Sequence, residues 1–175
     1  INTTILDLGC GTGFSTSDGP GSIGVDLSEE MLNVANKLFP NKQFVEGNAE
    51  DPFVEGDFDV VSMMFLFHEV PQFSRKRIIN KAKMIADKRV VVVDIAPEYV
   101  PSRLMESGEP YLRDYLANIR HDLNDFNEHV LVKGHVHMWT YDNIPEVKPL
   151  ITPPPSKVYS TRTKLDYRGV PMIDF

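Results

Sequence analysis

This sequence of 175 residues has few cysteines, no long apolar run and no excess of basic residues, and each of these absences argues against a class of protein. A single cysteine, Cys10, excludes an internal disulfide bond, because two cysteines are needed to form one. No apolar run approaches the roughly 20 residues that a membrane-spanning helix needs. Lysine and arginine number 18 against 25 acidic residues, and the net charge of −7 argues against binding to DNA or RNA. The composition predicts a soluble protein, intracellular or organellar, although a targeting segment before Ile1 would not be visible.

The glycine-rich segment of residues 6–16, LDLGCGTGFST, is the most informative stretch that is present. Its apolar start predicts a strand. Gly9, Gly11 and Gly13 then let the backbone approach a bound nucleotide, because a side chain there would block the approach or forbid a positive φ. A dinucleotide fingerprint needs its third glycine at position 14, where this chain has Phe14, so the spacing points away from NAD. The simpler alternative is a glycine turn that merely links a strand to a helix.

A second short apolar strand ends in a carboxylate, Asp26. Ser28 follows as a candidate N-cap, with Glu29 and Glu30 in the first turn of a predicted helix. An acidic side chain at the end of the second strand accepts hydrogen bonds from both ribose hydroxyls in nucleotide-binding enzymes. We expect that role for Asp26, and the alternative is an ordinary turn residue at a strand end.

These two motifs resemble those of the class I S-adenosylmethionine-dependent methyltransferases, in particular the small-molecule members of types 11 and 25. Residues 44–50, FVEGNAE, are similar to the segment where the family usually has Gly-Asp-Ala and the acid contacts the adenine amino group. Asn48 stands at that position, and its amide oxygen can accept the same bond without charge. Residues 58–71, FDVVSMMFLFHEVP, resemble the fourth strand and the loop after it. The resemblance covers residues 1 to about 95.

The resemblance implies S-adenosylmethionine as the cofactor and a small molecule with an oxygen, nitrogen or carbon nucleophile as the methyl acceptor. Cys10 is expected to be a small packing residue without a metal or redox role. His135 and His137 have the spacing of zinc ligands, but no third ligand accompanies them and methyl transfer needs no metal, so none is expected. The implied cofactor-binding residues are Asp7, Gly9, Cys10, Gly11, Gly13, Asp26, Leu27, Asn48, Ala49 and Phe65.

Oxygen and nitrogen acceptors also need a base. His68 and Glu69 lie in the predicted loop after the fourth strand and are the expected catalytic residues, because the pKa of histidine suits proton transfer near neutral pH. Alternatively, the His68 ring supports the adjacent turn through hydrogen bonds, and Glu69 pairs with a neighbour.

The alternation of strands and helices predicts an α/β, Rossmann-like, doubly wound and mostly parallel sheet, with its ligand crevice at the carboxyl ends of the strands. The segment between Phe14 and Asp18 is too short for a proper helix, so either the first helix is a single turn or residues are missing between Ser17 and Gly19. The expected strands lie near residues 3–8, 22–26, 43–46, 58–64 and 89–95, the helices near 28–38, 74–86 and 109–126, and an antiparallel edge strand or hairpin at 129–141.

Two domains are expected. Residues 1–141 form the S-adenosylmethionine-binding domain, and residues 142–175 form a proline-rich extended arm, of which residues 145–175 are a candidate surface for a protein partner. Family members usually carry a cap region before the first strand, and we expect that region to be missing before Ile1. A second class of function stays open, a non-catalytic methyltransferase-like subunit that serves as a structural or binding module in a larger assembly. Asn48, the short first crossover and the arm favour this alternative, whereas the intact glycine turn and Asp26 favour an enzyme.

Overall fold

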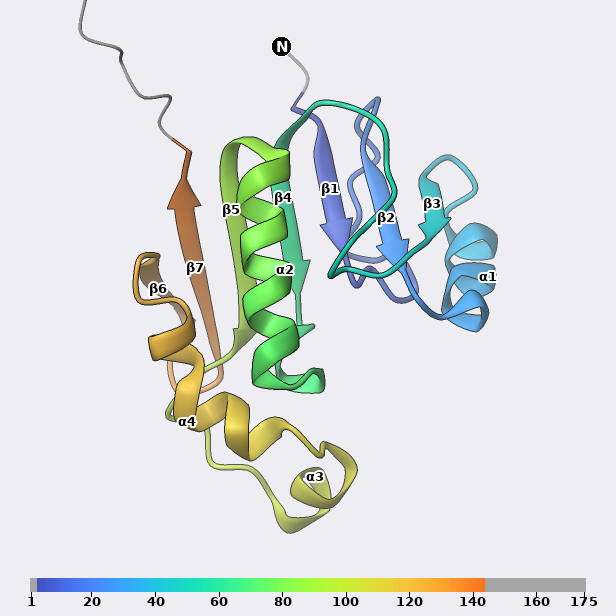
Figure 1. Cartoon of the computed structure of the whole chain (residues 1–175). Helices are drawn as coiled ribbons and strands as arrows, with labels where there is room; N and C mark the ends of the chain where they lie inside the picture. Colours follow the sequence, from blue (N-terminus) through green and yellow to red (C-terminus); the bar gives the residue numbers. More distant parts are fainter. Residues whose placement is uncertain (1–2, 144–175) are drawn as a thin grey trace, which may run out of the picture. The chain divides into compact units, whose positions relative to one another are not determined.

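The computed structural model describes residues 3–143, and within this part of the chain seven strands form one sheet in the order β3-β2-β1-β4-β5-β7-β6 (Figure 1). The predicted arm lies outside the described residues, except for Asp142 and Asn143. The strands are β1 (Ile5–Leu8), β2 (Ile23–Asp26), β3 (Gln43–Glu46), β4 (Phe58–Met64), β5 (Ala86–Ile95), β6 (Asn127–Val132) and β7 (Val136–Asp142).

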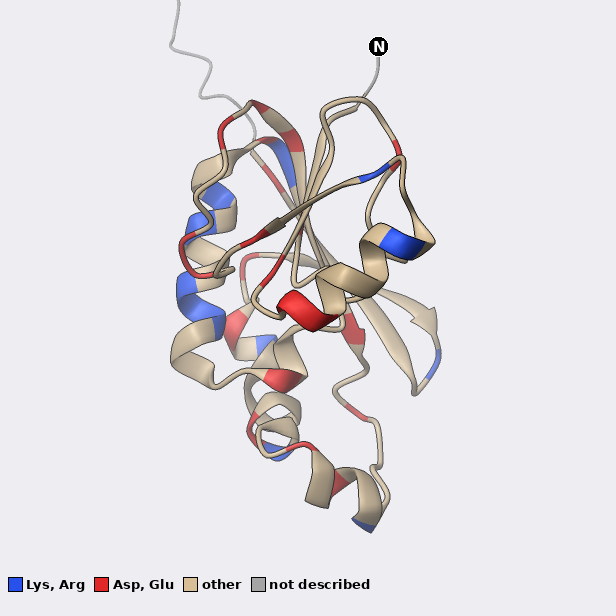
Figure 2. Cartoon of the chain, turned by 90° about the vertical axis from the view of Figure 1, so that its right-hand side faces the viewer, with Lys and Arg blue, Asp and Glu red and all other residues tan. Residues whose placement is uncertain are grey.

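Helices lie between the strands, and α1 and α2 cover opposite faces of the sheet (Figures 1 and 2). Helix α1 joins β2 to β3, on one side of β1 in the sheet, and α2 joins β4 to β5, on the other side. Because both crossovers are right-handed, the two helices lie on opposite faces of the sheet. None of the helices within residues 3–143 has the length and apolar character that a bilayer crossing requires. The helical elements are α1 (Glu29–Leu38), the 3-10 turn η1 (Phe67–Glu69), α2 (Gln72–Ile85), α3 (Arg103–Gly108) and α4 (Leu112–Asp122).

The start of α1 follows the predicted pattern. The Ser28 hydroxyl accepts a hydrogen bond from the Met31 backbone N–H at 3.3 Å, which satisfies one of the free donors at the helix start. Glu29 and Glu30 occupy the first turn and Lys37 the last, so the charges oppose the helix dipole (Figure 2). This helix begins at Glu29, shortly after Asp26, the carboxylate that ends β2.

The strand pairing confirms the predicted fold class. Strands β1 to β5 are all parallel, as expected. The predicted antiparallel addition is a hairpin, in which β7 pairs with β5 and β6 forms the outermost strand. The two candidate zinc ligands separate there, since His135 lies exposed before β7 while His137 is buried with its Nδ1 2.6 Å from Glu128 Oε1.

Two elements differ from the sequence prediction. The helix expected from Glu109 to Phe126 is shorter, beginning at Leu112, and the separate helix α3 precedes it. Residues 9–22 contain no helix, in agreement with the expected short crossover. The loop there packs tightly on β2, because a Cβ placed on Gly24 would lie 2.6 Å from Thr16 Oγ1 and 2.9 Å from Cys10 Sγ.

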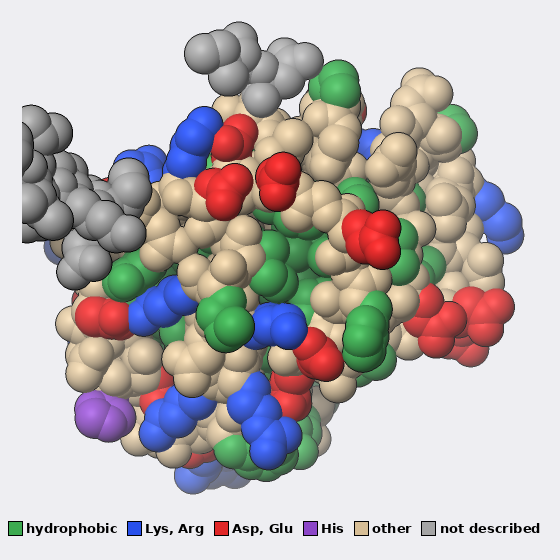
Figure 3. Space-filling model, turned by 45° about the horizontal axis from the view of Figure 1, so that its top comes forward, with side chains coloured by type: hydrophobic (Ala, Val, Ile, Leu, Met, Phe, Trp, Pro, Cys, Tyr) green, Lys and Arg blue, Asp and Glu red, His purple; other side chains and the backbone are tan. Residues whose placement is uncertain are grey.

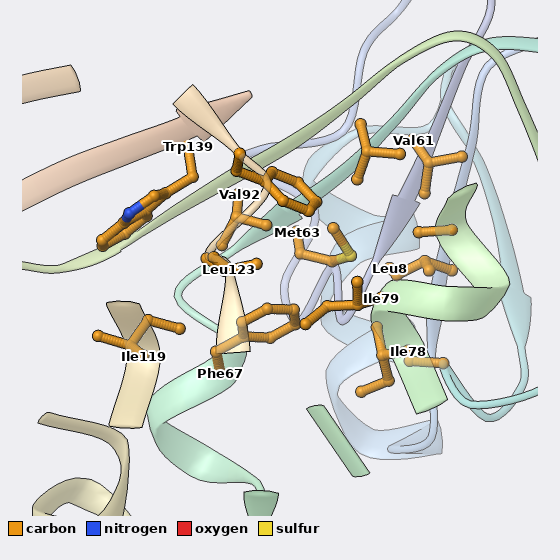
Figure 4. Packing of buried hydrophobic residues seen from close by; sticks show 14 of the residues in the cluster. Leu8, Val61, Met63, Phe67, Ile78, Ile79, Val92, Ile119, Leu123 and Trp139 are labelled. Carbon is orange, nitrogen blue, oxygen red and sulfur yellow. The ribbon is translucent and has the colours of Figure 1, made fainter. Parts of the chain in front are cut away.

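The core lies between the sheet and the layer formed by α2 and α4 (Figure 4). Burial of this apolar surface is the main force that holds the helices on the sheet. The residues labelled in Figure 4 come from four strands, η1, α2, α4 and its C-cap: Leu8, Val61, Met63, Phe67, Ile78, Ile79, Val92, Ile119, Leu123 and Trp139.

A buried arginine joins α2 to α4. The Arg75 side chain is fully buried, and its Nε donates to Asp122 Oδ2 at 2.9 Å while Nη2 donates to Asp114 Oδ2 at 2.8 Å. Its Nη1 donates to the Val70 carbonyl at 2.9 Å. The same side chain therefore fixes two helices and the loop after β4, where the predicted catalytic residues lie.

Candidate cofactor and acceptor site

Two adjoining hollows lie at the carboxyl ends of β1, β2 and β4. They have volumes of about 280 Å³ and about 680 Å³ and share four lining residues, Gly9, Asp26, Leu66 and Glu69. The smaller hollow extends along residues 47–50. The larger one extends along the glycine turn and an apolar rim. In a doubly wound sheet this edge is where ligands bind.

The glycine turn is held against β2 by its own backbone. Gly9 N and Cys10 N both donate to the Val25 carbonyl, at 2.8 and 3.0 Å. Gly9 has a φ of +73°, and a Cβ placed on it would lie 2.7 Å from Leu66 Cδ1. The backbone angle therefore favours glycine at this position, and the Leu66 side chain of the loop after β4 packs into the space beside it.

The Asp26 carboxylate links the glycine turn to the start of α1. Its Oδ2 accepts from Gly11 N at 2.7 Å, and its Oδ1 accepts from Ser28 N at 2.9 Å. Asp26 also lines both hollows. Since each carboxylate oxygen can accept two hydrogen bonds, both oxygens keep capacity for hydroxyl groups of a ligand.

The Asp7 side chain anchors the glycine turn through hydrogen bonds. This fully buried carboxylate accepts hydrogen bonds from Ser15 Oγ at 2.7 Å, Thr16 Oγ1 at 2.8 Å and Ser62 Oγ at 3.0 Å. Burial raises the pKa of Asp7 above its usual value, although the three hydroxyl donors oppose the rise. Asp7 lines neither hollow, so the geometry makes it an anchor of the loop that carries the glycines.

The predicted base, His68, is buried behind the site. It is 7% exposed and lines neither hollow. Its Nδ1 lies 2.6 Å from Asp94 Oδ1, and Asp94 also accepts from the backbone N–H groups of Phe67 and Ile95 at 2.8 and 2.7 Å. The His68 Nε2 lies 4.0 Å from Glu69 Oε1, and Glu69 lines both hollows. The order from the buried strand to the site is thus Asp94, His68, Glu69.

The pKa values of both predicted catalytic residues are shifted upward. Burial, the strongest influence on His68, favours its neutral form, but the hydrogen bond and charge of Asp94 with the charges of Glu69 and Glu109 outweigh it and raise its pKa. Burial raises the pKa of Glu69, against the opposing effect of His68. Proton uptake by either group is therefore easier than in water.

Most of the predicted site residues meet at the two hollows. Burial, reinforced by the charges of Asp7 and Asp26, raises the pKa of the Cys10 thiol to about 12, which agrees with an unreactive packing residue. Asp7, Gly13 and His68 do not line a hollow. Those that line one are Gly9, Cys10, Gly11, Asp26, Leu27, Asn48, Ala49, Phe65 and Glu69.

The residues of this region that the sequence prediction missed include Phe14, Met31 and Leu66 at the hollows, and Asp94 beside His68. The sequence places Asp94 directly after the apolar run Val90–Val93, but it does not indicate that this carboxylate meets His68. The three apolar residues have no signal of a site either, since their spacing also suits core positions.

An open glycine turn after β1 and a carboxylate after β2 define a Rossmann-like nucleotide-binding protein. Residues 5–88 match the family model described as a methyltransferase domain. Residues 5–88 thus carry a methyltransferase domain, and the prediction of a class I S-adenosylmethionine-dependent methyltransferase from the glycine turn is confirmed.

Curated relatives carry methyltransferase names. A demethylmenaquinone methyltransferase of Lactococcus lactis is 40% identical over 83 residues, covering 40% of this chain and 33% of the relative. One of Chlorobaculum tepidum is 48% identical over 67 residues, covering 35% of this chain and 28% of the relative. The chain thus spans about a third of the length of these relatives. They give no support to the non-catalytic alternative.

Solved structures confirm the fold. A magnesium protoporphyrin IX methyltransferase of Synechocystis with bound SAH has a TM-score of 0.59 at 18% identity, covering 81% of this chain and 74% of that one. An S-adenosylmethionine-dependent methyltransferase of Aquifex aeolicus has a TM-score of 0.57 at 17% identity, covering 81% of this chain and 82% of that one.

Proposed function

We propose that this chain provides the cofactor-binding and catalytic domain of an enzyme that transfers a methyl group from S-adenosylmethionine to a small molecule. The observation that carries the proposal is the position of Asp26. Its carboxylate borders both hollows and keeps hydrogen-bonding capacity on each oxygen.

The residues at the hollows fit this cofactor. A Cβ placed on Gly11 would meet no atom within 4 Å, so the glycine turn opens to space that a ligand can use. In the proposed arrangement Asp26 holds the ribose hydroxyls, Asn48 and Ala49 contact the adenine, and Leu27 packs against it. The methionine part lies along the glycine turn. When bound, the cofactor supplies a methyl group activated by a positively charged sulfur, with a thioether as leaving group.

The chain's own contribution is to align the acceptor, exclude water and take up a proton. Glu69 borders the hollows and is 60% exposed, so it is free to reach an acceptor hydroxyl or amine. His68 lies directly behind it, oriented by Asp94. We propose that Glu69 contacts the acceptor and that His68 receives the proton that the acceptor hydroxyl or amine loses. The relatives named for demethylmenaquinone make an apolar ring compound the acceptor to test first.

Calorimetric titration with S-adenosylmethionine tests the assignment of Asp26. The variant Asp26→Ala should bind the cofactor about 2–3 kcal/mol more weakly than the wild-type chain, the cost of losing hydrogen bonds to a charged group. Asp18→Ala, which removes an exposed carboxylate near the turn, is the matched control and should bind normally. Because Asp26 also holds Gly11 and Ser28, Asp26→Asn is measured alongside, with thermal melting to establish that both variants fold. Unchanged affinity in folded Asp26→Ala would refute the assignment.

A further inference from the structure

Phe65 has a backbone conformation that its side chain makes costly. Its φ is +57°, and within residues 3–143 no other residue except glycine has a positive φ. In left-handed backbone the Cβ atom approaches the following carbonyl oxygen, so bulky residues rarely adopt it. Glycine would form the same turn without this steric cost.

The neighbours of Phe65 fix the turn. Its backbone N–H donates to the Val93 carbonyl on β5 at 2.8 Å. The next residue, Leu66, packs against Gly9, and Phe67 is fully buried with its N–H donating to Asp94 Oδ2 at 2.8 Å. The chain must therefore pass from strand to η1 almost at once, and the left-handed residue makes that change of direction.

Folding does not explain the aromatic ring at this position. Phe65 is 46% exposed, so its ring contributes little to the core. It lines the larger hollow together with Met31 and Phe14, which is 75% exposed. The Phe14 ring is held in an edge-to-face contact with Phe39, with centroids 5.1 Å apart. Grouped exposed apolar side chains at a hollow are typical of a binding site, and strained backbone persists mainly where function retains it.

We propose that Phe65 positions the methyl acceptor: its ring forms one apolar wall of the larger hollow, and its strained backbone is retained because it places the ring there. This inference rests on the proposed function and adds a residue that acts on the acceptor. It gives Phe65 a different role from the cofactor contact expected from the sequence. The smaller hollow, along residues 47–50, is left to the adenosine part of the cofactor.

Two variants distinguish the effect of the strained backbone at Phe65 from the effect of its ring on ligand binding. Phe65→Gly removes both the ring and the strain, so its melting temperature should rise by about 1–4 °C. Phe65→Ala removes the ring and keeps the strain, so its melting temperature should not rise. Both should bind SAH as the wild-type chain does. Both should bind the apolar phenol 1-naphthol, titrated into the SAH-loaded chain, on the order of tenfold more weakly, because an apolar contact is lost.

Phe53→Gly is the matched control, since Phe53 is exposed, has an ordinary φ and lines neither hollow. It should show no rise in melting temperature and unchanged affinity for 1-naphthol. The inference is overturned if Phe65→Gly is not stabilised, if its affinity for 1-naphthol equals that of the wild type, or if the SAH-loaded wild type does not bind 1-naphthol. Failure of the wild-type chain to bind SAH at all would instead contradict the proposed function.

Discussion

His68 and Asp94 form a buried pair whose charge state depends on pH. The Asp94 carboxylate helps to raise the pKa of His68 above the ordinary value of 6.5. A raised pKa means that the folded state binds the proton more tightly than the unfolded chain does. The stabilisation is therefore complete below the unfolded-state pKa and is lost as the pH rises through the folded-state pKa.

Replacing Asp94 tests the origin of this shift. In Asp94→Asn the negative charge beside Nδ1 is gone, so the pKa of His68 should fall, because burial then dominates. An NMR titration of the His68 ring protons measures the change directly. Asp87→Asn, at an exposed position on the same strand, should leave the pKa of His68 unchanged. An equal pKa of His68 in wild type and Asp94→Asn would show that Asp94 does not cause the shift.

Single residues were predictable where their signal is local. Asp26 ends an apolar strand and Ser28 caps the helix that follows, so sequence order alone indicates their positions. The partner of His68 was not predictable in the same way, since Asp94 lies 26 positions further along the chain and meets it only through the pairing of β4 with β5. The left-handed backbone at Phe65 has no sequence signal, because glycine is the residue expected there.

At the scale of elements, Arg75 determines how α2 and α4 sit together. Arg75→Ala should lower the free energy of unfolding by about 3–5 kcal/mol, because it leaves the fully buried Asp122 carboxylate without the positive charge that it pairs with. Urea denaturation measures the loss. Arg77→Ala, two residues along the same helix, removes an exposed pair with Glu50 and should cost less than about 1 kcal/mol. Equal losses in the two variants would contradict the role given to the buried ion pair.

Elements with an apolar pattern were predictable, and the one helix within residues 3–143 that lacks such a pattern was not. The five parallel strands and α1 follow from apolar runs, a cap and alternating periods. The short helix α3 was missed, because six residues without a buried side chain leave no apolar stripe to detect. The predicted start at Glu109 was wrong for a related reason: Pro110 marks a helix start in sequence, but the residues around it form the turn between α3 and α4.

At the scale of the whole molecule, the charge pattern agrees with a small-molecule acceptor. The net charge is −7, and the face shown in Figure 3 carries basic and acidic side chains intermingled. Nucleic-acid binding normally needs basic residues gathered on one surface. The compartment, and a protein partner for residues 145–175, stay predictions from the sequence.

The glycine turn and Asp26 are proposed to form a site for S-adenosylmethionine. The decisive measurement is a calorimetric titration of the wild-type chain with S-adenosylmethionine, repeated in the presence of NADH. One molecule of S-adenosylmethionine should bind per chain and NADH should not compete, because Phe14 stands where a dinucleotide fingerprint requires glycine. Binding of NADH in preference to S-adenosylmethionine would contradict the proposed site.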